Sequence, residues 1–329
     1  MSDSVITITK YSHSFSLTQI TPRARNAINM FAVKYVQKGM VKTANGFQNV
    51  PVKVYGSALA NREEYHFHIN QFQRFIEILE KDYIKPSMYK LIEEPIYDAV
   101  SIKADMPANW TPRDYQEAII EYLCGSEVEA DFNNKKAVHK FVGIRTGGGK
   151  TSMALKAISV FKKRVAIVVQ PKYIKKWIED VEKTYGLTKK DIIVVQGSKE
   201  LQTLMKLAQS DEIKASFIII SCVTLQFYIK NYESLGKGIK TMGYPYLPHE
   251  LFKALGVGIR LIDEVHQSFH LYFKIDCYTH VPYSISLSAT LLNLDQFMLD
   301  MYAIAYPIAM RYKDAALKKY IKVKAMMYS

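Results

Sequence analysis

The sequence has few cysteines, and their spacing suggests no pairing. Cys124, Cys222 and Cys277 are scattered over 329 residues without a C-x-x-C pattern. This supports neither a disulfide framework nor a zinc site, and it fits a reducing cytoplasm. No apolar run approaches the roughly 20 residues needed to span a bilayer. The first residues also lack a basic region followed by an apolar core. We therefore expect a soluble cytoplasmic protein that is not secreted and has no membrane partner.

Acidic residues are also scarce relative to basic ones. Lys and Arg outnumber Asp and Glu by 44 to 31, which gives a formal net charge of +13. Such an excess favours a polyanionic partner, and nucleic acid is the leading candidate. The hydrophobic share of 49% over 329 residues is sufficient for two domains with proper cores.

The most informative stretch is residues 141–153, where an apolar run leads into a glycine cluster and then into a helix-forming segment. The cluster consists of Gly147, Gly148 and Gly149. Without Cβ atoms the backbone can curl so that its N–H groups approach phosphate oxygens. The helix that follows presents its positive end to the same anion. Lys150 can reach the β- and γ-phosphates, and the Thr151 hydroxyl can bind Mg²⁺. The preceding strand and the Lys-Thr ending favour this interpretation over a surface loop that happens to contain glycines.

A second signal is the segment Leu261-Ile-Asp-Glu-Val-His266, an apolar strand that ends in paired carboxylates. Asp263 and Glu264 should lie at the carboxyl edge of the sheet, beside the phosphate loop. One carboxylate can hold the Mg²⁺ shell, and the other can orient and deprotonate a water molecule. Standing alone, such a pair would be interpreted as a helix cap. His266 and His270 are four residues apart, but no third ligand follows at a suitable spacing, so zinc is not supported.

The residues around these motifs alternate between strand and helix patterns. Continuous β-branched runs, typical of strands buried on both faces of a parallel sheet, occur at residues 164–170, 191–195, 216–221, 258–263 and 283–288. Helical patterns separate them at residues 175–185 and 198–209. This arrangement predicts an α/β fold built on a P-loop, doubly wound parallel sheet.

The first hundred residues predict a small α+β domain, which we place at residues 1–104. Strand patterns occur at residues 5–9, 50–55, 64–69 and 89–96, and helical patterns at residues 23–36 and 71–81. The role of this domain stays open between contact with duplex nucleic acid and simple packing. Residues 105–112, with two prolines, predict a linker. A helix that is capped at Thr111 should then run to about Cys124, and residues 125–136 predict a loop.

Three motifs occur in the order found in superfamily 2 DExH helicases, and the chain resembles that family. Thr146 to Thr151 resembles motif I, the Asp-Glu-Val-His at residues 263–266 resembles motif II, and Ser288-Ala-Thr290 resembles motif III. Weaker similarities are to the adenine-reading element at residues 113–116, to motif Ia at residues 169–171 with Trp177, and to motif Ib at residues 220–225. The sequence departs from common patterns at Ile144, where the longer P-loop motif has glycine, and at Lys172, where motif Ia usually has threonine.

The resemblance implies ATP and Mg²⁺ as cofactors, and it implies a role for each matched residue. Arg113 and Gln116 would recognise adenine. The phosphates would be bound by Thr146, Gly147, Gly148, Gly149, Lys150 and Thr151. Lys150, Asp263 and Glu264 would be catalytic, with Glu264 as the base, while Thr151 and Asp263 hold the metal. Nucleotide state would be coupled to movement through His266, Ser288 and Thr290. Nucleic acid would be bound by Lys172, Lys175, Lys176 and Thr224.

The activity implied by the resemblance is that of an ATP-dependent DNA helicase or translocase. Its first RecA-like lobe would span residues 113–310, followed by a basic segment at residues 311–329. The small domain ahead of the lobe is similar in layout to that of phage branch-migration helicases of the UvsW kind, so forked, branched or duplex DNA is the expected partner. Three alternatives stay open: an RNA helicase, a restriction-type duplex translocase, and a non-catalytic nucleic-acid-binding module that uses ATP as a conformational ligand.

The residues after Thr290 do not match the arginine motif of a second helicase lobe, Q-x-x-G-R-x-x-R. We therefore expect a second RecA-like lobe to be supplied in cis or in trans. Phosphoryl transfer depends strongly on such arginines, often by a factor of about 10³ or more. The 329-residue polypeptide alone is accordingly expected to bind ATP weakly and to hydrolyse it poorly.

Overall fold

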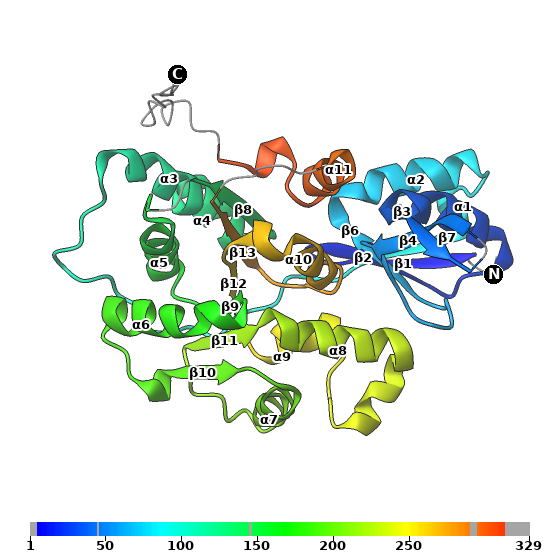
Figure 1. The fold of residues 1–329 in the computed structure, drawn as a ribbon. Helices are drawn as coiled ribbons and strands as arrows, with labels where there is room; N and C mark the ends of the chain where they lie inside the picture. The colour runs from blue at the N-terminus through cyan, green and yellow to red at the C-terminus, as the bar shows by residue number, and fades with distance from the viewer. Residues whose placement is uncertain (1–4, 45, 145–146, 290–294, 313–329) are drawn as a thin grey trace, which may run out of the picture.

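The computed structural model describes residues 5–44, 46–144, 147–289 and 295–312 (Figure 1). Within these ranges the strands form a six-stranded sheet, a five-stranded sheet and a separate hairpin. None of the helices in the described ranges is long and apolar enough to cross a membrane.

The six-stranded sheet carries the motifs, and every pair of neighbouring strands in it is parallel. Its strands are β8 (Val138–Gly143), β9 (Val165–Val169), β10 (Ile192–Val195), β11 (Phe217–Ser221), β12 (Ile259–Ile262) and β13 (Tyr283–Ser288). Their order across the sheet is β10-β11-β9-β12-β13-β8. The α/β parallel sheet predicted from the β-branched runs is confirmed, with β13 lying between the strands of motifs I and II.

Helices cover both faces of this sheet, as a doubly wound fold requires. Along β9, Val165, Ile167 and Val169 belong to one apolar core, and Ala166 and Val168 belong to another. The first core contains α3 (Asp114–Cys124), α5 (Lys150–Phe161) and α6 (Ile174–Tyr185). The second contains α7 (Ser198–Gln209), α8 (Cys222–Leu235), α9 (Leu251–Ala254), α10 (Phe269–Asp276) and α11 (Gln296–Ala305).

The N-terminal residues form the five-stranded sheet, in the order β5-β6-β2-β1-β7. Its strands are β1 (Ile6–Lys10), β2 (Ser14–Thr18), β5 (Ser57–Ala58), β6 (Tyr65–His68) and β7 (Tyr89–Glu93), and the two helices of this region are α1 (Pro22–Ala32) and α2 (Phe72–Lys81). Aromatic rings fill the space between sheet and helices, with Phe31 edge-on to Phe67 at 4.9 Å and to Phe75 at 5.1 Å. The α+β character predicted for this region is therefore observed.

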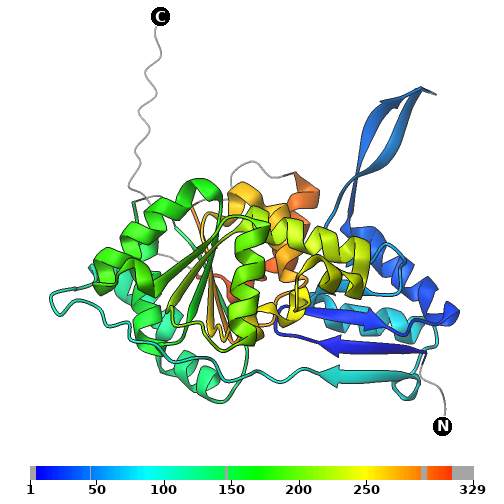
Figure 2. The same ribbon diagram turned by 90° about the horizontal axis from the view of Figure 1, so that it is seen from below.

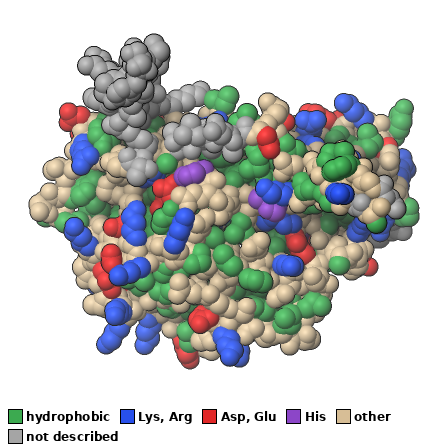
Figure 3. Space-filling model, viewed as in Figure 1, with side chains coloured by type: hydrophobic (Ala, Val, Ile, Leu, Met, Phe, Trp, Pro, Cys, Tyr) green, Lys and Arg blue, Asp and Glu red, His purple; other side chains and the backbone are tan. Residues whose placement is uncertain are grey.

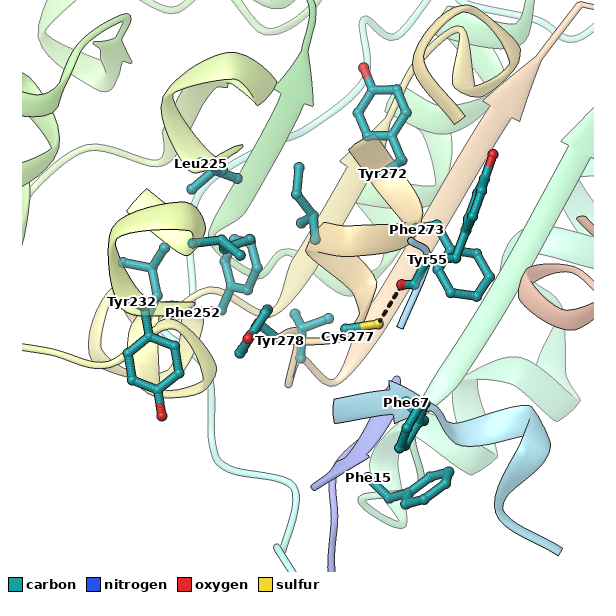
Figure 4. Packing of buried hydrophobic residues seen from close by; sticks show 14 of the residues in the cluster. Phe15, Tyr55, Phe67, Leu225, Tyr232, Phe252, Tyr272, Phe273, Cys277 and Tyr278 are labelled. Atoms are coloured by element: carbon teal, nitrogen blue, oxygen red, sulfur yellow. Dashed lines mark hydrogen bonds between the residues drawn. The ribbon is translucent and has the colours of Figure 1, made fainter. Parts of the chain in front are cut away.

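One continuous apolar core joins the N-terminal sheet to the six-stranded sheet. Phe15 and Phe67 belong to the same buried cluster as Phe273 and Tyr278, which lie on and just after α10 (Figure 4). Residues 94–113 contain neither a helix nor a longer strand, and their backbone pairs with the six-stranded body at Val100 and Ile102. The boundary predicted at residues 105–112 stays a prediction.

Several local predictions were wrong. Residues 125–136, predicted as a loop, contain α4 (Ser126–Asn133), in which acidic residues occupy the first turn and Val128 is buried. The helix predicted to be capped at Thr111 begins at Asp114 with Arg113 as its cap. Between residues 36 and 55, only residues 50–55 were predicted as strand. In the structure, β3 (Val36–Thr43) and β4 (Gly46–Val54) form a hairpin that projects from the body (Figure 2).

Candidate nucleotide site

The predicted motifs meet at one edge of the six-stranded sheet. Gly143, the last residue of β8, pairs in register with Ser288 at the end of β13. Ile262, the last residue of β12, pairs with Ser286 on the other side of β13. The phosphate loop, the Asp263–Glu264 pair and Ser288 therefore leave the sheet at the same edge, where ligands bind in open α/β sheets.

Two of the three glycines in the phosphate loop adopt backbone conformations that favour glycine. Gly147 has φ = +83° and Gly149 has φ = +78°, a region that L side chains rarely enter. A Cβ added at Gly149 would also collide with the side-chain nitrogen of Gln116. Gly149 directly precedes α5, so the first N–H groups of that helix face the loop. Thr146 lies outside the described residues.

Lys150 and Glu264 converge at this edge although they are far apart in the sequence. Lys150 Nζ lies 3.7 Å from Glu264 Oε1 and donates a hydrogen bond of 3.2 Å to the Ile144 carbonyl. The lysine is 8% exposed. Glu264 has φ = +50° and ψ = +49°, a left-handed conformation that costs about 1–2 kcal/mol in a residue other than glycine. Backbone strain of this kind tends to concentrate at functional sites.

Asp263 is almost fully buried, with an exposed fraction of 3%. The indole N–H of Trp177 on α6 donates to its Oδ2 at 3.1 Å, and the backbone N–H of Glu264 donates to its Oδ1 at 2.9 Å. Burial raises the pKa of Asp263 and the neighbouring Glu264 charge raises it further, whereas the Trp177 indole stabilises the charged form. The two donors hold this carboxylate in one orientation.

His266 connects the acidic pair to the neighbouring strand. Its Nδ1 lies 3.0 Å from Ser288 Oγ and 3.3 Å from Glu264 Oε2. The structure therefore brings together two of the three residues predicted to couple nucleotide state to movement. The third, Thr290, lies outside the described residues.

Gln116, predicted to recognise adenine, is turned towards the phosphate loop. Its Oε1 accepts from the backbone N–H of Arg113 at 3.0 Å, and its Nε2 donates to the Gly148 carbonyl at 3.4 Å. The Tyr115 hydroxyl donates to the same carbonyl at 3.3 Å and accepts from Arg113 at 3.1 Å. Adenine recognition by Arg113 and Gln116 stays a prediction. The contact of Tyr115 with the loop was not anticipated.

Three of the four predicted nucleic-acid contacts are exposed. Lys172, Lys175 and Lys176 lie at the start of α6 or just before it, and all three are exposed. Figure 3 shows several Lys and Arg side chains over α6, interspersed with acidic ones. Thr224 lies in the first turn of α8 and is buried, with an exposed fraction of 4%, so it does not share a surface with the lysines.

The residues present fit a nucleotide with Mg²⁺. Gly147 and Gly149 have the positive-φ conformations that a phosphate loop uses, Lys150 supplies a positive charge, and Glu264 Oε2 is buried with no hydrogen-bond partner among the described residues, its one ion-pair contact there being with His266. The described residues contain no group of three or more His, Cys, Asp or Glu side chains that could hold a metal by themselves. Mg²⁺ typically binds one or two carboxylates together with water and phosphate oxygens, which Asp263 with Thr151 would suit.

A parallel sheet that carries a glycine loop, a buried lysine and an acidic pair at one edge is the arrangement typical of a P-loop nucleotide-binding lobe. Residues 109–293 match the family model described as "Type III restriction enzyme, res subunit", and the chain belongs to this family of helicase-like motors. No curated protein matches the chain.

Solved structures with similar chains include the helicase domain of Hef from Pyrococcus furiosus. It is 16% identical, with a TM-score of 0.38, over 59% of this chain. The present chain spans 36% of the length of that structure.

The hydrogen bond from Trp177 to Asp263 leads to a prediction about metal affinity. Trp177→Phe keeps the ring packing but removes the donor, and loss of such a partner typically lowers metal affinity about 10- to 100-fold. We expect the Mg²⁺ concentration needed for half-maximal binding of a fluorescent ATP analogue to rise about tenfold, with binding of the metal-free analogue unchanged. Trp110→Phe, in the irregular segment before α3, is the control. Equal Mg²⁺ requirements in the two variants would contradict the prediction.

Proposed function

We propose that this protein is an ATP-dependent DNA helicase or translocase, of which residues 113–310 form the first motor lobe. The observation that carries the proposal is the approach of Lys150 to Glu264 within 3.7 Å at the edge where β8 and β12 end. A buried cation beside a strained, partly unpaired carboxylate is an arrangement suited to a triphosphate and an attacking water molecule.

Each residue at the edge has a proposed task. Thr151 and Asp263 would hold Mg²⁺, which when bound neutralises phosphate charge. Lys150 and the loop N–H groups would bind the β- and γ-phosphates, and Arg113 with Gln116 would bind the adenine. Glu264 would orient the water molecule and accept its proton. The contact between His266 and Ser288 supports a role of that pair in passing the nucleotide state to the rest of the lobe.

The proposed partner is DNA in a forked, branched or duplex form, as for phage branch-migration helicases of the UvsW kind. The net charge of +13 and the exposed Lys172, Lys175 and Lys176 support binding to a phosphate backbone. A second RecA-like lobe, in cis or in trans, would supply arginines to the γ-phosphate. Action in the cytoplasm is part of the same proposal.

A second candidate function is translocation on duplex DNA without strand separation. The description of the matching family, a restriction-enzyme subunit, favours it. An RNA helicase would use the same lobe, because the Asp-Glu-Val-His motif does not select a substrate.

ATP turnover by the protein that carries this lobe together with its second lobe tests these proposals. Turnover is measured with forked DNA, blunt duplex DNA and single-stranded RNA of equal length. The proposed helicase predicts the greatest stimulation by forked DNA, whereas a translocase predicts equal stimulation by the two DNAs. Stimulation by RNA alone would contradict both, and no stimulation by any of the three would contradict a nucleic-acid motor.

A further inference from the structure

The hairpin of β3 and β4 is the most prominent projection of the described chain (Figure 2). Eight positions pair along it, from Val36 opposite Val54 to Thr43 opposite Gly46. Most of its side chains on either strand are exposed. A two-stranded hairpin gains little stability by itself in water, so an exposed one of this length calls for a further explanation.

The composition of the hairpin is basic and apolar. Residues 36–54 contain three lysines, Lys38, Lys42 and Lys53, and no acidic residue. The side chains of Lys38, Met40 and Lys42 lie on one face of β3, because alternate residues of a strand share a face. Phe47 of β4 lies directly opposite Lys42 and therefore on the same face. Met40 is 68% exposed and Phe47 is 69% exposed. One face therefore combines ammonium groups with an exposed aromatic ring near the turn.

The base of the hairpin is fixed to the helices that follow motifs II and III. His270 of α10 lies with its Nε2 3.0 Å from the Val54 carbonyl, and Lys274 Nζ donates to the Gly56 carbonyl at 3.1 Å. Gln37 donates to Asp295, the cap of α11, at 3.0 Å.

Tyr55, directly after β4, is fully buried in the same region. Its ring packs edge-on against Phe273 at 5.2 Å, and Cys277 lies against its carbonyl (Figure 4). The hairpin is thus fixed at its base to α10 and to the cap of α11, and it is not a loosely attached extension.

We propose that this hairpin is a binding arm for single-stranded polynucleotide, in which Lys38 and Lys42 contact phosphates and Phe47 stacks on an unpaired base. The inference rests on the proposed function, since it assigns where the nucleic acid is held. Three positive charges without an acidic residue are complementary to a polyanion. An exposed aromatic ring beside a lysine is a recurring means of binding single strands, because their bases are unpaired and can stack on the ring, whereas the bases of a duplex cannot.

The test is fluorescence anisotropy of the full chain with labelled oligo(dT) and with a duplex of the same length, over a range of salt concentrations. Phe47→Ala should weaken oligo(dT) binding about tenfold, in keeping with the loss of one stacked base. Lys38→Ala with Lys42→Ala should lower the salt slope by about 1.4, because each phosphate contact on a single strand contributes about 0.7. Duplex binding should change less in both variants.

Matched controls are available elsewhere on the surface. Phe227→Ala removes an exposed aromatic ring from α8, and Lys189→Ala with Lys190→Ala removes two exposed lysines that precede β10. These variants should bind oligo(dT) as the unaltered chain does.

The possible failures are distinguishable. If the unaltered chain binds no polynucleotide, the proposed function and the arm are both overturned. If it binds but the arm variants bind equally well, or lose duplex binding to the same degree, the arm alone is overturned. Self-association of the unaltered chain that disappears in the Phe47→Ala variant would instead identify the hairpin as a contact between copies.

Discussion

Glu264→Gln is expected to reduce ATP turnover about 10²- to 10⁴-fold, the usual contribution of a general base. Gln keeps the size and shape of the side chain but cannot accept the proton of the attacking water molecule. Lys150 loses its partner at 3.7 Å yet remains free to bind phosphate, so ATP binding should be retained. Turnover is measured in the protein with both lobes, and binding of a fluorescent ATP analogue is measured in the 329-residue chain.

Glu129→Gln, an exposed change on α4, is the control for the loss of one negative charge. Its turnover should equal that of the unaltered protein. A Glu264→Gln variant that keeps full turnover would assign the base to another residue. If the unaltered protein has no turnover and Glu264→Gln leaves nucleic-acid binding unchanged, the chain is a binding module in which ATP serves only as a conformational ligand.

Asp276→Ala is expected to lower the free energy of unfolding by about 3–5 kcal/mol, the cost of breaking a buried ion pair from one side. Asp276 Oδ1 lies 2.6 Å from a guanidinium nitrogen of Arg260, and the side chains are 2% and 1% exposed. Burial raises the pKa of Asp276, and Arg260 opposes this rise. Without the carboxylate, Arg260 keeps hydrogen bonds to Thr279 and Ser284 but has lost its close countercharge.

The measurement is urea unfolding followed by circular dichroism, with the slope compared between variants. Asp131→Ala removes one partner of the exposed pair with Lys136 and should cost at most about 1 kcal/mol. Replacing both buried partners, Arg260→Met with Asp276→Leu, should recover much of the loss, because an apolar pair leaves no charge uncompensated. A loss below about 1 kcal/mol for Asp276→Ala would show that water reaches Arg260.

The inner strands β9, β11 and β12 of the six-stranded sheet could be predicted because each is buried along its whole length, so that its sequence is a nearly continuous apolar run such as residues 165–169. The sequence of the β3–β4 hairpin, by contrast, contains no such apolar run. Its side chains are exposed on both faces, so polar and apolar residues do not alternate, and Gly39 and Pro51 further weaken the pattern. α4 was missed because its eight residues bury only Val128.

The candidate site was predictable as a set of motifs but not as a set of contacts. The glycines and the acidic pair are recognisable because backbone curvature and strand ends constrain which residues can occur there. Trp177 was noted for its spacing, but its hydrogen bond to Asp263 joins residues 86 positions apart. The burial of Thr224 and the orientation of Gln116 depend on contacts with residues distant in the sequence, which local sequence patterns do not reveal.

The continuous core beneath the N-terminal sheet limits how this protein can be divided or recombined. A fragment beginning at residue 105 would present the aromatic side of α10, including Phe273, to water, since Tyr35 and Tyr55 now cover it. Such a fragment would be expected to aggregate. An unrelated module could replace the N-terminal region only if it supplied aromatic side chains that cover α10 as Tyr35 and Tyr55 do. The N-terminal region therefore covers part of the lobe's own apolar core and is not an independent unit that can be removed from it.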